Sequence, residues 1–408
     1  MEKKYYTFSL SNGMRVVYWH RQGALVSYIG AVINAGSRDE DLSRQGLAHF
    51  VEHTIFKGTD KRRSWQISSR MESVGGELNA YTSKEDTMIY TSAPSGYEER
   101  ATELIADLVM SSRFPHEEIE RERDVVIEEI YSYLDSPAES VFDEFEELAY
   151  EGSGLAHNIL GTPESVKDLT GNFCREFLDM FYTPKNMVLY GSSSIDPLAF
   201  VKIAEKYFGK MDFNFRGHNR ICPPPLSPFD MTREKGNHQA NTIVGARTFG
   251  RKDPRRFALF LLNNYLGGPN MNSRLNRELR EKRGYVYTVD SSVSLMSDTG
   301  LMVVYFGCDK KNIDKCKKII RNEIDRLCQN KISPSAFEKI KKQYCGQLLL
   351  TSDHIENRSM ALAKSLMYFD VIHDISTTAE RIMEVTPEEL MDVAQLLAPE
   401  KCGSLTLC

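Results

Sequence analysis

The chain has 408 residues, 41% of them hydrophobic and 26% charged, a composition typical of a folded globular protein. This length exceeds what one hydrophobic core usually serves, so we expect two domains. The net charge of -6 gives no basic excess that would suggest nucleic-acid binding, and no apolar run approaches the roughly 18 residues needed to span a bilayer. We therefore expect neither a nucleic-acid partner nor a membrane segment.

The N-terminal stretch MEKKYYTFSLSNGMRVVYWH lacks the apolar core and the small-residue cleavage site of a secretory signal. All eight cysteines lie between Cys174 and Cys408, with no CxxC pair and no conspicuous disulfide spacing. Both features favour a cytoplasmic protein whose thiols are reduced.

The first half of the sequence alternates strand-like runs with helical ones. Residues 24–36 and 86–94 are typical of strands, whereas residues 97–112 have helical periodicity. This mixture favours an α/β or α+β domain, which we place at residues 1–216.

Within this domain the run GLAHFVEHTIFKGT, residues 46–59, carries two histidines and a glutamate. Its apolar residues recur at helical spacing, and Gly58 suits the end of a helix. Because positions i and i+4 share a helix face, His49 and His53 can aim at one point, with Glu52 beside them. This HxxEH pattern predicts a metal site. The alternative is a set of solvated or hydrogen-bonded side chains, which is the usual explanation of a single histidine.

A catalytic zinc site needs a third protein ligand, and the helical run at residues 114–134 offers candidates. Glu122 and Glu129 fall at gaps in its apolar stripe, whereas Glu128 points to the opposite side. A carboxylate on a buried face is costly unless it is paired or bound to a cation, so we expect a positive partner there. Periodicity nominates Glu129 or Glu122 and rejects Glu128. If the stripe is narrower than it looks, both carboxylates reach water.

The sharpest break in composition is GHNRICPPPLSPFD, residues 217–230, where four prolines exclude a helix and a central strand. We predict that this segment is a linker and that a second domain follows at residues 231–408.

The second domain looks like a degraded repeat of the first. Matching Gly58 to Gly267 aligns the two helices that precede these glycines. The positions of the two histidines and the glutamate are then taken by Ala258, Leu261 and Leu262. The second half has lost the polar cluster.

Four separated motifs make the chain resemble the inverzincin metallopeptidases, the family of pitrilysin, insulin-degrading enzyme and the mitochondrial processing peptidase, over nearly its whole length. The motifs are GLAHFVEHTIFKGT, LNAYTSKEDTMIY, ERERDVVIEEI and GGPNMNSRLNRELREKRGYVYTV. The resemblance implies an α+β fold of two similar domains, each a mostly antiparallel sheet with helices packed on it. One departure is Pro269, where relatives often have glycine.

The resemblance also implies roles for residues of the first domain. It makes His49, His53 and Glu129 the ligands of one Zn²⁺ ion per chain. Glu52 would be the general base, and Glu122 would support the site from the outer shell.

For substrate binding, the resemblance implies that Arg280 and Tyr287 of the second domain face the substrate. Asn79 and Ala80 lie on a segment similar to the family's substrate-binding edge strand and would flank the scissile bond. Such a strand holds an extended peptide through main-chain hydrogen bonds.

The implied function is zinc-dependent endopeptidase activity on short or unfolded peptides in a closed chamber, with zinc-activated water as the nucleophile. Relatives build the chamber from four such domains, so a two-domain chain predicts a homodimer. Two alternatives are a dedicated processing subunit for presequences or proproteins and a non-catalytic partner subunit. The intact set of metal residues favours an enzyme.

Overall fold

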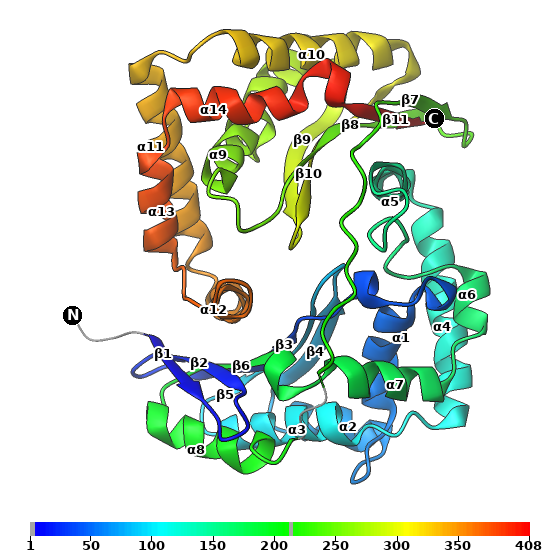
Figure 1. Ribbon diagram of the computed structural model, residues 1–408, viewed down its shortest axis with the longest axis vertical. Coiled ribbons are helices and arrows are strands. Elements are labelled where there is room, and N and C mark those ends of the chain that lie inside the picture. The colour runs from blue at the N-terminus through cyan, green and yellow to red at the C-terminus, as the bar shows by residue number, and fades with distance from the viewer. Residues whose placement is uncertain (1–4, 212–214) are drawn as a thin grey trace. The chain divides into compact units, whose positions relative to one another are not determined.

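The computed structural model describes residues 5–211 and 215–408, and its chain divides into two compact units (Figure 1). The first unit contains the chain up to Tyr131, His157–Arg220 and Ser352–His373, and the second contains Ser132–Ala156, Ile221–Thr351 and Asp374–Cys408. The units therefore differ from a simple division at the linker. The first unit includes Ser352–His373 from the second half of the sequence, and the second unit includes Ser132–Ala156 from the first half.

The first unit is built on a six-stranded sheet with the order β1-β2-β6-β3-β5-β4. Neighbouring strands are antiparallel except β2 and β6, which run parallel. The strands are β1 (Tyr5–Ser9), β2 (Arg15–His20), β3 (Val26–Ile33), β4 (Glu77–Thr82), β5 (Thr87–Pro94) and β6 (Met187–Ser193). β3 and β5 lie inside the two predicted strand runs. Because β4 is last in the order, one of its edges pairs with no strand among the described residues.

Helices cover both faces of this sheet. They are α1 (Leu47–Thr54), α2 (Ser64–Glu72), α3 (Glu98–Ser111), α4 (His116–Leu134), α6 (Pro163–Lys167), α7 (Gly171–Phe181), α8 (Pro197–Phe208) and α12 (Ile355–Phe369). α1, α3 and α8 pack on one face around the larger apolar core. α12 packs on the other face, where Leu362 and Leu366 contact a second core that includes Val32 and Tyr190. A helix from the second half of the sequence thus completes the first unit.

The second unit has a five-stranded sheet with the order β7-β11-β8-β10-β9, antiparallel except between β7 and β11. Its strands are β7 (Asp230–Arg233), β8 (Gln239–Phe249), β9 (Val286–Leu295), β10 (Thr299–Asp309) and β11 (Gly403–Leu407). Its helices are α5 (Pro137–Ala149), α9 (Arg256–Gly267), the π-helical turn η5 (Asn276–Glu281), α10 (Ile313–Gln329), α11 (Pro334–Thr351), α13 (Ile375–Glu384) and α14 (Pro387–Ala394). α5, from the first half of the sequence, packs against β8 and β11.

The repeat predicted from the sequence has a physical counterpart in α9. Ala258, Leu261 and Leu262, which match the polar cluster of the first half, are buried in the apolar core of the second unit. At these positions α9 therefore contributes packing and no metal-binding side chain.

The proline-rich segment contains no helix or strand between α8 and β7 in its described residues, as its prolines predict. Its first residues belong to the first unit, because His218 Nδ1 lies 2.8 Å from Asp39 Oδ1 and Arg220 Nη2 donates to Asp39 Oδ2 at 2.7 Å.

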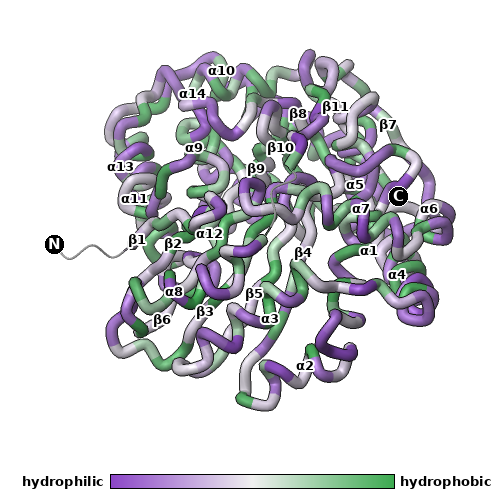
Figure 2. Tube along the Cα trace, turned by 60° about the horizontal axis from the view of Figure 1, so that its bottom comes forward, coloured by the Kyte–Doolittle hydropathy of each residue, from purple (hydrophilic) through white to green (hydrophobic). Residues whose placement is uncertain are grey.

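The prediction of an α+β fold with two similar domains is confirmed: each unit is a mostly antiparallel sheet with helices on it. Hydrophilic and hydrophobic residues alternate along the chain in both units, as expected of elements with one buried side (Figure 2). In the described part of the chain, no helix combines the length and apolar character needed to cross a membrane.

Candidate functional site

Helix α1 carries His49, Glu52 and His53 and has only eight residues. It starts after Gly46, whose φ of +87° suits glycine and whose missing side chain leaves room for the carbonyl of Leu160. The helical path continues through the 3₁₀ turn Ile55–Lys57 and ends at Gly58, as predicted. The apolar side of the helix is buried in the core of the first unit. Local sequence and packing therefore fix the direction of its polar side chains.

A buried carboxylate holds the start of α1. Glu40 accepts hydrogen bonds from the backbone amides of Gly46 at 2.8 Å and Ala48 at 2.7 Å. Its Oε2 also lies 3.1 Å from His157 Nε2, which is 2.9 Å from the carbonyl of Ser37. Burial raises the pKa of Glu40, although these hydrogen bonds act in the opposite direction. The first amides of a helix have no partner within the helix, so the acceptor oxygens of Glu40 stabilise the start of α1.

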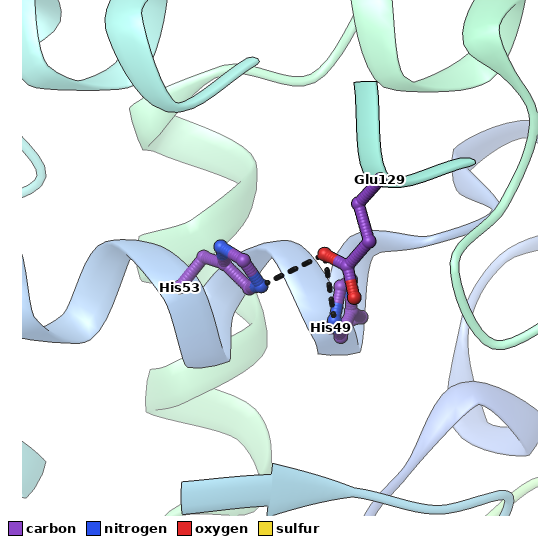
Figure 3. Close-up of side chains that lie close together, drawn as sticks. All are labelled: His49, His53 and Glu129. Carbon is purple, nitrogen blue, oxygen red and sulfur yellow. Dashed lines mark ion pairs between the residues drawn. The ribbon is translucent and has the colours of Figure 1, made fainter. Parts of the chain in front are cut away.

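His49, His53 and Glu129 converge on one point, with one ligand atom of each within 4.8 Å of the others (Figure 3). Glu129 Oε2 lies 3.3 Å from His53 Nε2 and 3.9 Å from His49 Nε2. A tetrahedral zinc with ligands at about 2.0–2.2 Å separates its ligand atoms by roughly 3.3–3.6 Å. The distance from His53 to Glu129 falls in this range and the distance from His49 exceeds it by about 0.3 Å, so two imidazoles and a carboxylate are close to the arrangement that zinc needs. In the described part of the chain, no second group of this kind is present.

The partners of His53 define which of its nitrogens can bind a metal. His53 Nδ1 lies 2.9 Å from Glu122 Oε1, and Lys57 Nζ lies 2.6 Å from Glu122 Oε2. Burial raises the pKa of Glu122, but the hydrogen bonds from His53 and Lys57 outweigh it and lower the pKa. The ionised carboxylate accepts the Nδ1 hydrogen, so Nε2, on the side of Glu129, is the nitrogen that a metal ion would bind after losing any proton. Conversely, burial lowers the pKa of His53, but Glu122 and Glu129 raise it overall.

His49 is held in its neutral form. Burial, with a contribution from the neighbouring His53, lowers the pKa of His49 to about 3. Its Nδ1 is buried and hydrogen-bonds to none of the described residues. A neutral imidazole is the form that binds metals.

The predicted burial of Glu129 on α4 is wrong. Its side chain is 44% exposed, whereas that of Glu122 is 9% exposed. The buried stripe of α4 consists of Ile119, Glu122, Val126 and Ile130, so it is narrower than predicted. The cation expected beside the buried carboxylate is Lys57, which pairs with Glu122. Glu128 is exposed and outside the group, as predicted.

Glu52 lies beside the metal group and is tied to strand β4. Its Oε2 accepts a hydrogen bond of 2.6 Å from Thr82 Oγ1, and burial raises its pKa. In β4, Asn79 pairs with Tyr90 and Ala80 with Ile89, both on β5. These pairings use one edge of β4, and the other edge is the open edge of the sheet.

Arg280 and Tyr287 lie in the second unit and are both exposed. Arg280 belongs to the π-helical turn η5, and its guanidinium forms no ion pair with the described residues. Tyr287 is 50% exposed and donates a hydrogen bond of 2.8 Å to Asp309 Oδ1. Tyr287 sits in β9 opposite the point where its pairing with β10 shifts register.

Sequence reasoning missed Glu40, His157, Lys57 and Thr82. Thr82 could have been found, because strand alternation places it on the same face as Ala80, which packs toward the core around α1. Lys57 follows His53 by four residues and so shares its helix side. His157 gives no local signal, since its contact with Glu40 spans 117 residues.

Two family models match the chain. Residues 15–163 match the model described as insulinase, peptidase family M16, and residues 168–344 match the peptidase M16 inactive domain. The first model includes all three residues of the metal group. The second includes Arg280 and Tyr287.

Whole-chain relatives agree with these matches. The chain is 30% identical over 98% of its length to an uncharacterized zinc protease of Mycobacterium leprae, covering 90% of that protein. It is 29% identical over 96% of its length to an uncharacterized zinc protease of Bacillus subtilis, covering 95% of it. A protease from Helicobacter pylori has the same fold, with a TM-score of 0.92 at 21% identity and 99% coverage of both chains.

The neutral state of His49 predicts a pH dependence of stability in the metal-free protein. Its pKa is about 3 in the folded chain against an ordinary 6.5, so below pH 6.5 the unfolded chain binds a proton that the folded chain does not. The free energy of unfolding should fall as the pH drops, by up to about 1.4 kcal/mol per pH unit from this group. Urea unfolding at pH 7 and pH 5, with a chelator present, should show a steeper loss for the wild type than for His49→Gln. Equal losses would contradict the assignment.

The contact between Glu122 and His53 predicts an effect on metal affinity. Glu122→Gln removes the charge that fixes the Nδ1 hydrogen, so zinc should bind about ten- to a hundredfold more weakly. Competition with a chromophoric chelator measures this. Glu128→Gln, on the same helix but outside the group, is the matched control and should bind zinc like the wild type. The assignment fails if both variants bind alike.

Proposed function

Because the chain belongs to peptidase family M16, we propose that it is a zinc-dependent endopeptidase that hydrolyses short or unfolded peptides. The observation that carries this proposal is the convergence of His49, His53 and Glu129 beside Glu52. The names of its relatives as zinc proteases support the same chemistry.

His49, His53 and Glu129 would hold one zinc ion per chain. When bound, zinc supplies a Lewis acid that polarises the peptide carbonyl and makes water easier to deprotonate at neutral pH. Glu52 is on the same face of α1 but outside the ligand set, and its carboxylate takes a proton from the attacking water and gives it to the leaving amine. Burial raises the pKa of Glu52, which suits a group that must both accept and return a proton.

The substrate would bind along the open edge of β4 as an added strand. Main-chain hydrogen bonds then hold an extended peptide with little regard to its side chains. Asn79 and Ala80 would lie beside the scissile bond, and Arg280 and Tyr287 would bind the substrate backbone or the developing oxyanion. The exposed side chains of Arg280 and Tyr287 support this role.

Two related functions compete with this proposal. A dedicated processor of presequences or proproteins would use the same residues on a narrower set of substrates. A non-catalytic partner subunit would not need a metal group, and the complete set of His49, His53, Glu129 and Glu52 favours an enzyme.

Substitution of Glu52 separates metal binding from catalysis. Glu52→Gln keeps all three ligands but cannot accept the proton, so it should bind one zinc per chain and lose peptide hydrolysis by at least about a hundredfold. His49→Ala should lose both properties. Elemental analysis of the zinc-loaded proteins and cleavage of a mixed peptide library measure the two effects. Cleavage by Glu52→Gln at the wild-type rate would end the assignment of the base.

We further propose that the active protein is a homodimer whose four domains enclose the substrate. Sedimentation of the zinc-loaded protein should then give about twice the chain mass of 46.5 kDa. The peptidase activity should follow this species through size-exclusion chromatography. A fully active monomer would contradict the dimeric chamber.

A further inference from the structure

We propose that Thr82 is a positioning residue for peptide hydrolysis, because its hydroxyl fixes Glu52 relative to the strand that receives the substrate. This inference rests on the proposed peptidase function and adds a residue to which neither the family resemblance nor the metal group assigns a role.

The hydrogen bond from Thr82 engages one carboxylate oxygen of Glu52 and leaves the other available. A carboxylate can only accept, so Thr82 Oγ1 donates to Oε2, and its length of 2.6 Å is in the range of hydrogen bonds to charged oxygen. Oε1 makes no hydrogen bond to the described residues. The geometry therefore makes Oε1 the oxygen available to the attacking water, and rotation of the carboxylate would break the bond to Thr82.

Thr82 is itself held in place by the turn that follows it. Residues 84–86 are three consecutive charged residues, all buried. Lys84 donates to the carbonyl of His157 at 2.6 Å, Glu85 pairs with Arg38 at 2.6 Å, and Asp86 pairs with Lys364 at 2.6 Å.

Each of these contacts joins the turn to a different segment of the first unit. Moving the turn would break two ion pairs and the hydrogen bond of Lys84 at once, and uncompensated buried charges are costly. The end of β4 is therefore held rigidly, and Thr82 at this end can fix the position of Glu52 through its hydrogen bond.

The position of Thr82 on β4 connects the base with the peptide. Ala80 and Thr82 are two residues apart, so they share a face of the strand and lie about 7 Å apart along it. A peptide paired with β4 is positioned by the same strand that positions Glu52. Since a misplacement of about 1 Å can cost a hundredfold in rate, this shared support matters for proton transfer.

The test compares two substitutions at Thr82 with one at a second buried threonine. Thr82→Val keeps the branched shape and removes the hydroxyl, so kcat should fall about ten- to a hundredfold with KM and zinc affinity within about twofold of the wild type. Thr82→Ser keeps the hydroxyl and should restore most of kcat. Thr91→Val is the control, because the Thr91 hydroxyl donates to the carbonyl of Ile29 within the same sheet. It should lower the melting temperature and leave kcat unchanged.

Several results would overturn the role of Thr82. These are a Thr82→Val enzyme with wild-type kcat, a Thr82→Ser enzyme as slow as Thr82→Val, or a loss of kcat that is accompanied by loss of zinc affinity. A zinc-loaded wild type that cleaves no peptide would overturn the proposed function together with this inference. The wild type and Glu52→Gln, assayed alongside, distinguish the two failures.

Discussion

The hydrogen bonds from the amides of Gly46 and Ala48 to the buried carboxylate of Glu40 fix the start of α1, and the candidate site depends on that helix. A helix of eight residues is marginal in isolation. Contacts at its ends and on its buried face must therefore stabilise its helical conformation. Glu40 in turn lies 3.1 Å from His157, so a contact between distant parts of the sequence supports the start of the helix that carries His49 and His53.

The two histidines are prepared for metal binding by different contacts. His49 is neutral because it is buried, and His53 is oriented because Glu122 accepts its Nδ1 hydrogen. Lys57 balances the charge of Glu122, so a buried carboxylate can serve the site without a metal contact of its own. Burial keeps His49 neutral, and the hydrogen bond to Glu122 orients His53, so one nitrogen of each ring is directed to the same cation site.

Patterns with a short period were readable in the sequence. The helices with His49 and Glu129 and two of the strands follow from spacing, and the apolar counterpart that includes Ala258 follows from the internal repeat. The family resemblance selected Glu129 over Glu122 as a ligand. The exposure of Glu129 was predicted wrongly. Successive residues of a helix are rotated by about 100°, and this rotation places Glu129 at the border of the buried stripe of α4, where burial is hard to predict. Contacts between distant segments, such as His157 with Glu40 and α12 with the first sheet, depend on the tertiary fold and leave no periodic signal.

The position of α12 has a consequence for the order of events during synthesis. The chain emerges from the ribosome N-terminus first, and domains near the N-terminus usually fold first. Here one face of the first sheet stays uncovered until residues 355–369 have been made. The apolar core on that face, which includes Val32 and Tyr190, can therefore be completed only when nearly the whole chain exists, whereas His49, His53 and Glu129 are made much earlier.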